Sequence, residues 1–224
     1  MGLIPLPIWA PGACPPRPDE CWQAISASLL GNLIPGEYYR TMAQRFETRQ
    51  WVPFPVELVF AFFANPSKLP HLMPPAQKVR IEDIRMQAPP ARPVAPDPAR
   101  RFRSIVAGAG SEILISFCPV RWLPVRVSWI ARIVEFEWNR HFVDEQVRGP
   151  FRQFRHRHAV APEVRAGVEG AQVTDAIEYV LPGAAAGQMA APLARRQLEK
   201  AFAYRQERLP QILALAADQA VRKI

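Results

Sequence analysis

The stretch Asp144–His158, which reads DEQVRGPFRQFRHRH, has the pattern of a β-hairpin that carries polar residues on one side. Gly149-Pro150 separates two runs that favour extended structure. In the second run a period of two separates an inward set from an outward set. The inward set is Phe154, His156, His158 and Val160, and the outward set is Arg155 and Arg157. Because a face with Phe and Val points to a core, both histidines are predicted to face a core or cavity.

The segments around this hairpin predict one antiparallel sheet with a long closing helix. A strand pattern over residues 45–52 is followed by apolar residues at helical spacing up to Pro66 and by a second short helical turn over 67–75. Strand patterns then cover residues 79–86, 111–117, 125–136, 141–147, 151–160 and 173–181. This order of strand, two short helices, five or six antiparallel strands and one helix predicts an α+β helix-grip fold, in which the sheet wraps around the helix.

The closing helix is predicted beyond Pro182-Gly183, where the composition changes to Ala, Arg, Gln, Glu and Leu. Its inward positions are Leu198, Phe202, Leu209 and Leu213, at separations typical of an amphipathic helix. Pro210 lies within this segment and is expected to kink the helix or to end its first part.

Length and composition favour one soluble domain. The 224 residues are 49% hydrophobic, enough for a single core, and we expect a ligand-binding domain over residues 42–224. Residues 1–41 hold seven prolines and are expected to be an extension that is disordered or precedes the true start at Met42. No apolar run reaches about 18 residues, and no basic residue precedes the apolar N-terminus, so neither a membrane span nor a secretory signal is predicted. Three cysteines without a close pair favour a reducing, cytoplasmic location.

The chain has a formal net charge of +8, and its basic character belongs to the predicted domain, since residues 1–41 carry two arginines against three carboxylates. Four arginines are dense in the hairpin: Arg148, Arg152, Arg155 and Arg157. They indicate a solvated strand face or, alternatively, peripheral contact with an anionic membrane surface or a clamp for an acidic ligand. No recognisable nucleic-acid module is present, and no nucleic-acid partner is expected.

Four segments resemble the START-like or SRPBCC superfamily, in its ligand-binding, polyketide cyclase/dehydrase-like branch. They are FETRQWVPFPVELVFAFFANPSKLPHLMPP at 46–75, FVDEQVRGPFRQFRHRH at 142–158, TDAIEYVLPGA from Thr174 and FAYRQERL from Phe202. The resemblance runs from about residue 42 to 213, and Phe154 stands where relatives usually have Trp. It implies a bacterial protein with a helix-grip fold and a hydrophobic pocket. Members bind lipids or quinones, or act as polyketide aromatase/cyclases, so the fold alone does not decide between binding and catalysis.

The hairpin predicts an Asp–His pair. A turn near Gly149-Pro150 places Asp144 across from Phe154 or His156, within reach of an imidazole. We favour a pair that satisfies two buried polar groups. The alternative is an aromatase/cyclase or dehydratase that uses His156 or His158 as acid/base with Asp144 as the orienting partner. A further alternative is an interaction protein whose cavity is filled by side chains.

Metal binding is another possible role for the two histidines of the hairpin. His156 and His158 on one strand face could share an ion, with Asp144 or Asp175 as the third ligand. The further Glu and distant His of a cupin-like site are not found, so we predict no metal and no cofactor.

The favoured function is binding, with transport as an extension, of a hydrophobic small molecule such as a lipid, quinone or polyketide, between the sheet and the C-terminal helix. A non-enzymatic role is preferred. The residues predicted to line the cavity are Phe154, His156, His158, Trp129, Asp175, Tyr179 and Phe202.

Overall fold

The computed structural model describes residues 43–94, 104–119 and 125–221, so the predicted extension over residues 1–41 lies outside the described part. Seven strands form one antiparallel sheet in the order β1-β7-β6-β5-β4-β3-β2. The strands are β1 (Gln44–Val52), β2 (Arg80–Arg85), β3 (Glu112–Phe117), β4 (Val127–Glu137), β5 (His141–Arg148), β6 (Gln153–Arg165) and β7 (Val168–Val180). The helices are α3 (Val56–Phe63), the 3₁₀ turns η1 (Pro66–Leu72) and η2 (Pro75–Gln77), and α4 (Ala184–Val221).

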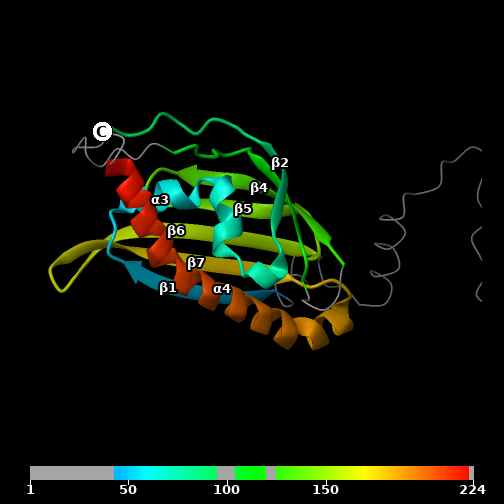
Figure 1. Ribbon diagram of the computed structural model, residues 1–224. Coiled ribbons are helices and arrows are strands. Elements are labelled where there is room, and N and C mark those ends of the chain that lie inside the picture. The colour runs from blue at the N-terminus through cyan, green and yellow to red at the C-terminus, as the bar shows by residue number, and fades with distance from the viewer. Residues whose placement is uncertain (1–42, 95–103, 120–124, 222–224) are drawn as a thin grey trace, which may run out of the picture. The chain divides into compact units, whose positions relative to one another are not determined.

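The sheet is a meander from β2 to β7 to which β1 is added at the far edge, beside β7. The crossover from β1 to β2 carries α3, η1 and η2. Figure 1 shows α4 running across the same side of the sheet as α3 and η1, and α4 contacts β1, α3 and η1. The predicted helix-grip α+β fold is therefore confirmed.

The β6–β7 hairpin is longer than the alternation predicts. β6 continues to Arg165 and β7 begins at Val168, so that two residues, Ala166 and Gly167, make the turn. Both have positive φ, 48° and 76°, which is the conformation of a type I′ turn that matches the twist of paired strands.

α4 is one continuous helix from Ala184 to Val221. Of the two outcomes predicted for Pro210, an end of the helix at that residue is therefore wrong. A proline in a helix lacks the N–H that the carbonyl four residues earlier would accept. That carbonyl belongs to Gln206, and it accepts a hydrogen bond of 2.7 Å from the side-chain Nε2 of Gln50 on β1. The contact with β1 therefore replaces the missing helical hydrogen bond. Among the described helices, none is long and apolar enough to cross a membrane.

Two apolar clusters fill the space between the sheet and its helices. The larger one joins α3 with the C-terminal half of α4, where Leu209 and Leu213 are almost fully buried. The smaller one, called the aromatic cluster below, lies under the N-terminal half of α4. It consists of Phe46, Phe154, Ile177, Tyr179 and Phe202, with Trp129, Phe151, Leu181, Ala194 and Leu198 packed against it.

Candidate functional site

A polar cluster is buried on the inner face of β5, β6 and β7. In the sheet register Asp144 lies opposite His156, and His158 lies opposite Asp175. The first of these pairings selects one of the two registers that the sequence allowed. His158 contacts Asp175 directly across the strands. Two further contacts run along the diagonal, from His158 to Asp144 and from His156 to Asp175. Cross-strand and diagonal neighbours on one face are close enough for such contacts.

Asp175 is the centre of this cluster. Its Oδ1 lies 3.0 Å from Nε2 of His156, 2.8 Å from Nδ1 of His158 and 3.2 Å from Nη2 of Arg205. Asp175 is only 4% exposed, and three donors converge on one of its oxygens. A buried carboxylate needs such partners because desolvation penalises its charge.

Arg205 reaches the cluster from α4. Its side chain is buried, and its guanidinium lies 4.4 Å from the ring centre of Phe63 and 5.3 Å from that of Phe202. We did not predict Arg205 from the sequence. A signal was present, because Arg205 occupies an inward position in the stripe from Phe202 to Leu209 at helical spacing.

The pKa values of His156 and His158 are shifted in opposite directions. Burial and the neighbouring His158 lower the pKa of His156, and its contact with Asp175 does not offset them. Burial alone would lower the pKa of His158, but hydrogen bonds to Asp144 and Asp175 outweigh it and raise that pKa. The nitrogens of His158 lie 3.1 Å from Asp144 and 2.8 Å from Asp175, so each faces a carboxylate.

The charges of Asp175 and Arg205 depend on each other. Burial would raise the pKa of Asp175, but Arg205 and the two histidines hold that pKa well below its usual range. Burial lowers the pKa of Arg205, while Asp175 and Asp144 act in the opposite direction. Arginine remains protonated in proteins, so the cluster holds an ion pair that joins α4 to the sheet.

Three of the residues can also offer ligand atoms to a metal ion. Asp144, His156 and His158 each have a donor atom within 4.8 Å of the other two. Asp175, the other candidate from the sequence, bonds both imidazoles and Arg205.

The remaining predicted residues lie in the aromatic cluster beside the polar one. Trp129 packs edge-on against Phe154, with ring centres 4.6 Å apart, and Tyr179 packs against Phe151. Phe202 links the clusters, because its ring lies 5.1 Å from Phe46 and 5.8 Å from His156. The predicted site residues thus fall into two adjoining groups.

Trp129 has a further property that the sequence does not reveal. Its indole Nε1–H is buried and has no hydrogen-bond acceptor among the described residues. By contrast, Nε1 of Trp138 donates to the carbonyl of Pro90 at 2.8 Å. Buried indole N–H groups usually find a partner, so Trp129 marks a position where an acceptor is missing.

Two hollows in the described part of the chain differ in size and in how open they are to solvent. The interior one, about 10 Å³, lies between β1, β7 and α4 and is lined by Thr48, Arg49, Gln50, Val173, Asp175, Phe202, Arg205, Gln206 and Leu209. Such a volume holds about one water molecule. The other, about 360 Å³, is an open groove lined by Arg49, Trp51, Glu163, Arg165 and Gln172. Arg165 already bonds Glu163 and Gln172 there, so this groove has little free donor capacity.

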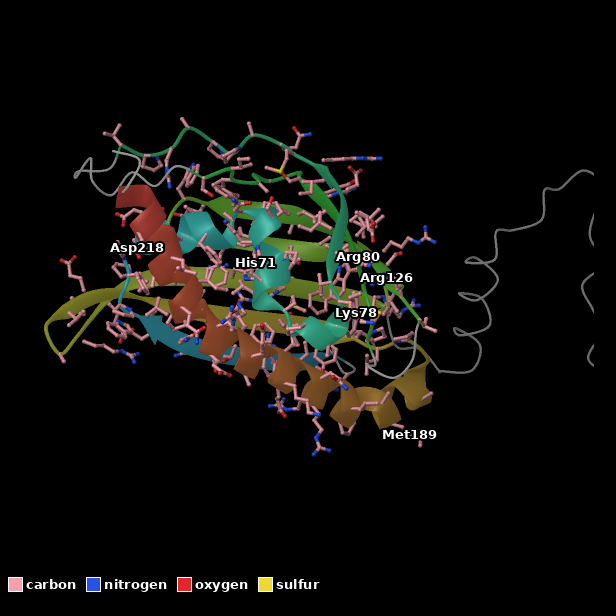
Figure 2. The ribbon with its side chains drawn as sticks, in the orientation of Figure 1. His71, Lys78, Arg80, Arg126, Met189 and Asp218 are labelled. Carbon is pink, nitrogen blue, oxygen red and sulfur yellow. The ribbon has the colours of Figure 1, made fainter. Side chains whose placement is uncertain are left out.

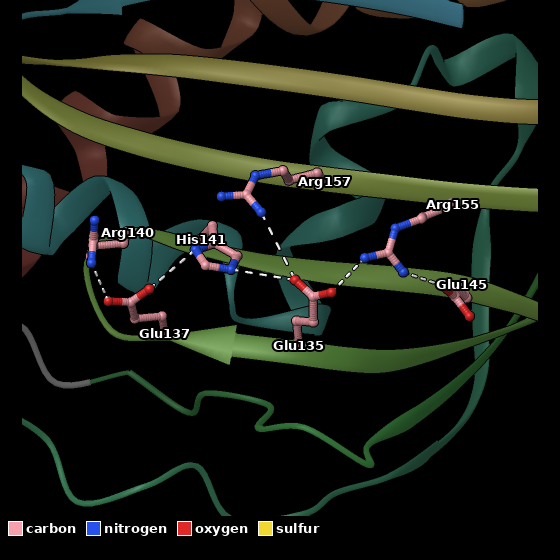
Figure 3. Close-up of polar contacts among 7 residues, drawn as sticks. All are labelled: Glu135, Glu137, Arg140, His141, Glu145, Arg155 and Arg157. Atoms are coloured by element: carbon pink, nitrogen blue, oxygen red, sulfur yellow. Dashed lines mark hydrogen bonds and ion pairs between the residues drawn. The ribbon is translucent and has the colours of Figure 1, made fainter. Parts of the chain in front are cut away.

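The outward arginines of the hairpin are paired with acids. Figure 3 shows Glu135 of β4 between the guanidinium groups of Arg155 and Arg157 and the ring of His141. Arg155 also bonds Glu145. These two arginines belong to a mixed-charge network on the outer face, and the other two arginines of the predicted group, Arg148 and Arg152, are exposed.

Similarity to known proteins is found among solved structures and not among curated sequences. No curated protein sequence matches the chain. Among solved structures, an aromatase/cyclase from Streptomyces sp. R1128 has a TM-score of 0.49 at 14% identity, covering 80% of this chain and 96% of its own. A START superfamily protein from Mycobacterium smegmatis has a TM-score of 0.48 at 10% identity, covering 76% and 97%. The protein TTHA0849 from Thermus thermophilus has a TM-score of 0.45 at 16% identity, covering 80% and 99%.

The family comparison covers more than half of the chain. Residues 52–203 match the model of the family described as polyketide cyclase/dehydrase and lipid transport. The matched range includes the whole β5–β6–β7 wall, with both histidines, Asp144 and Asp175. The chain therefore belongs to the polyketide cyclase/dehydrase and lipid transport family, within the START-like superfamily that the sequence resembles.

Proposed function

We propose that the protein binds a hydrophobic small molecule that carries a hydrogen-bond acceptor, such as a carbonyl oxygen, between the sheet and the N-terminal half of α4. Family membership and the helix-grip fold support binding in this region. The observation that carries the proposal is the buried indole N–H of Trp129, which has no acceptor in the part of the chain that the structure describes. The aromatic cluster around it supplies an apolar surface of the kind that lines ligand sites.

The energetic argument concerns the unpaired donor. A buried polar group without a partner costs about 1–3 kcal/mol. A ligand oxygen that accepts from Trp129 removes this cost, whereas a purely apolar ligand leaves it in place. Burial also raises the pKa of Tyr179, so its hydroxyl stays protonated and is a second donor at the same cluster. The rings of Trp129 and Tyr179 both pack against the ring of Phe151.

Access to this cluster requires α4 to move away from the sheet, because the side chains of Phe154, Ile177 and Tyr179 are packed together and buried under the helix. The N-terminal half of α4 is the part best suited to move. Met189 and Leu193 on this segment are 85% and 63% exposed, and Figure 2 shows Met189 at the outer end of α4. Segments with few buried contacts open at lower free energy than the core.

The test uses untagged full-length protein and native mass spectrometry. Wild-type protein should retain, or take up from a panel of fatty acids, naphthoquinones and aromatic polyketides, one molecule per chain. Trp129→Phe keeps the ring but removes the donor, so its affinity should fall by about 10-fold, equivalent to about 1.4 kcal/mol.

Trp138→Phe is the matched control, since the indole of Trp138 already has an acceptor in the protein. This variant should bind as tightly as the wild type. Equal affinities for wild type and Trp129→Phe, or no binding of any member of the panel, would refute the proposal.

A further inference from the structure

The polar cluster has a feature that ligand binding to the aromatic cluster does not use. Three atoms that could bind a metal ion lie within 4.8 Å of one another on the inner face of the sheet, one each from Asp144, His156 and His158. His156 is more than nine-tenths buried. Its Nε2 bonds Asp175, and no hydrogen bond joins its Nδ1 to another described residue.

Asp175 fixes how both imidazoles present their nitrogens. Its Oδ1 accepts from Nε2 of His156 at 3.0 Å and from Nδ1 of His158 at 2.8 Å. These bonds leave Nδ1 of His156 and Nε2 of His158 as the nitrogens available to a ligand. Nε2 of His158 lies 3.1 Å from Oδ2 of Asp144. A carboxylate that orients a metal-binding histidine through its other nitrogen is the usual supporting arrangement around metal ions.

The charge of the cluster also favours a cation. Asp144 and Asp175 contribute two negative charges and Arg205 one positive charge, so with neutral imidazoles the buried group carries a net charge of −1. The guanidinium of Arg205 lies against Asp175 and against Nδ1 of His158, on the side of the imidazole away from Asp144. Arg205 forms an ion pair with Asp175 and not with Asp144. The carboxylate of Asp144 is therefore the one that can pair with a bound cation.

We propose that Asp144, His156 and His158 form a binding site for a divalent transition-metal ion, with Asp175 and Arg205 as positioning residues. Two imidazoles and one carboxylate suit borderline ions such as Zn²⁺ or Co²⁺ and leave further coordination positions open. This inference does not depend on the proposed hydrophobic ligand.

The distances allow such a site after small adjustments. Zinc bonds to nitrogen and oxygen are about 2.0–2.2 Å, so two ligand atoms on one ion lie up to about 4.2 Å apart. Here each of the three residues offers a ligand atom within 4.8 Å of those of the other two. Side-chain shifts of a few tenths of an ångström bring all three atoms onto one ion, which then replaces the proton between His158 and Asp144.

The four histidines of the chain provide matched controls. His141 lies on the outer face, 3.5 Å from both Glu135 and Glu137, and His71 is exposed in η1 (Figure 2). His141→Gln tests the other histidine–carboxylate group, and His71→Gln tests adventitious surface binding.

The experiment is a titration of chelator-treated, untagged full-length protein with Zn²⁺ alone, followed by calorimetry, and with Co²⁺ alone, followed by visible absorption. Wild-type protein should bind one equivalent. Asp144→Asn, His156→Gln and His158→Gln should each weaken binding by more than 10-fold, and Asp175→Asn by about 10–100-fold with unchanged stoichiometry. His71→Gln and His141→Gln should bind as the wild type does.

X-ray absorption of the zinc-loaded wild-type protein gives a readout that needs no variant, in case a substitution prevents folding. Two imidazole ligands and oxygen ligands are expected. Sulfur ligands from the cysteines, no stoichiometric uptake, or equal loss of binding in the His71→Gln or His141→Gln protein would overturn the proposal.

Discussion

Arg205 carries the positive charge that allows Asp175 to remain ionised in the interior. The two residues are 8% and 4% exposed, and their atoms lie 3.2 Å apart. An isolated charge at this depth would be strongly unfavourable, and breaking a buried pair by removing one partner leaves such a charge. The stability of the fold should therefore depend on this arginine far more than on a surface arginine.

Arg205→Met should lower the free energy of unfolding by about 3–5 kcal/mol, because Asp175 loses its cationic partner. Chemical denaturation measures this. Arg195→Met is the control on the same helix, where the arginine is 57% exposed and pairs with Glu199, and it should cost less than about 1 kcal/mol. Similar costs for the two variants would show that the buried pair is not stabilising in this way.

The members of the polar cluster were not equally predictable. Alternation along β6 placed His156 and His158 on the inner face, and the hairpin brought Asp144 near them. The convergence of three donors on Asp175 depends on the register between β6 and β7, which alternation does not define. Arg205 was missed because a charged residue in an apolar stripe of a helix gives no indication of its buried partner on a distant strand.

α4 shows how a contact between elements overrides a local signal. Pro210 removes a helical hydrogen bond, which alone predicts a kink or an end. The helix continues because Gln50 of β1 donates to the carbonyl of Gln206 that Pro210 leaves without a partner. The sequence could not indicate this, since the residues involved are 156 positions apart.

A double-mutant cycle tests this compensation. Gln50→Ala should destabilise the wild type by about 1–3 kcal/mol, because the Gln206 carbonyl loses its donor. In a Pro210→Ala background the restored helical N–H satisfies that carbonyl, so the same substitution should cost at least about 1 kcal/mol less. Urea unfolding of the four proteins gives the coupling. Additive effects would mean that Gln50 does not substitute for the missing helical bond.

The ion pairs around Glu135 on the outer face of the sheet should make a small, pH-dependent contribution to the free energy of unfolding. The hydrogen bond from Arg155 is the largest cause that lowers the pKa of Glu135. A carboxyl with a lowered pKa stabilises the fold above its ordinary pKa and loses that contribution as the pH falls through the folded-state value. The groups involved are about 40% exposed, which screens their interaction.

Glu135→Gln should therefore cost less than about 1 kcal/mol at neutral pH. The difference from the wild type should shrink in high salt and disappear as the pH falls through the lowered pKa of Glu135. Urea denaturation at two pH values and two salt concentrations measures it. A deficit that persists unchanged at acidic pH would show that Glu135 acts by packing rather than by charge.

For the whole molecule, the order of elements and the helix-grip architecture could be predicted because periodicity of two or of 3.6 marks nearly every segment. The length of the β6–β7 hairpin, in which β6 ends at Arg165 and β7 begins at Val168, could not be predicted. Apart from Val164 and Val168, which are exposed, residues 161–172 have polar and small side chains, so no apolar alternation extends the predicted strands to the turn at Ala166 and Gly167.

The molecule as a whole places its polar cluster between two apolar groups, the larger core under α3 and the aromatic cluster under the N-terminal half of α4. The larger core fixes the C-terminal half of α4 to the sheet. The aromatic cluster holds the indole donor that lacks an acceptor among the described residues. This division is why we assign stability to one end of the helix and ligand binding to the other.

The most direct test of ligand binding at the aromatic cluster is the indole N–H resonance of Trp129 in a nitrogen–proton correlation spectrum, assigned with Trp129→Phe. A naphthoquinone, an apolar ring with carbonyl acceptors, is the probe. On titration the Trp129 N–H should move downfield as it gains an acceptor, while the N–H of Trp138, which already donates to Pro90, should not move. Saturable binding of the naphthoquinone that leaves the Trp129 resonance unchanged would contradict the account.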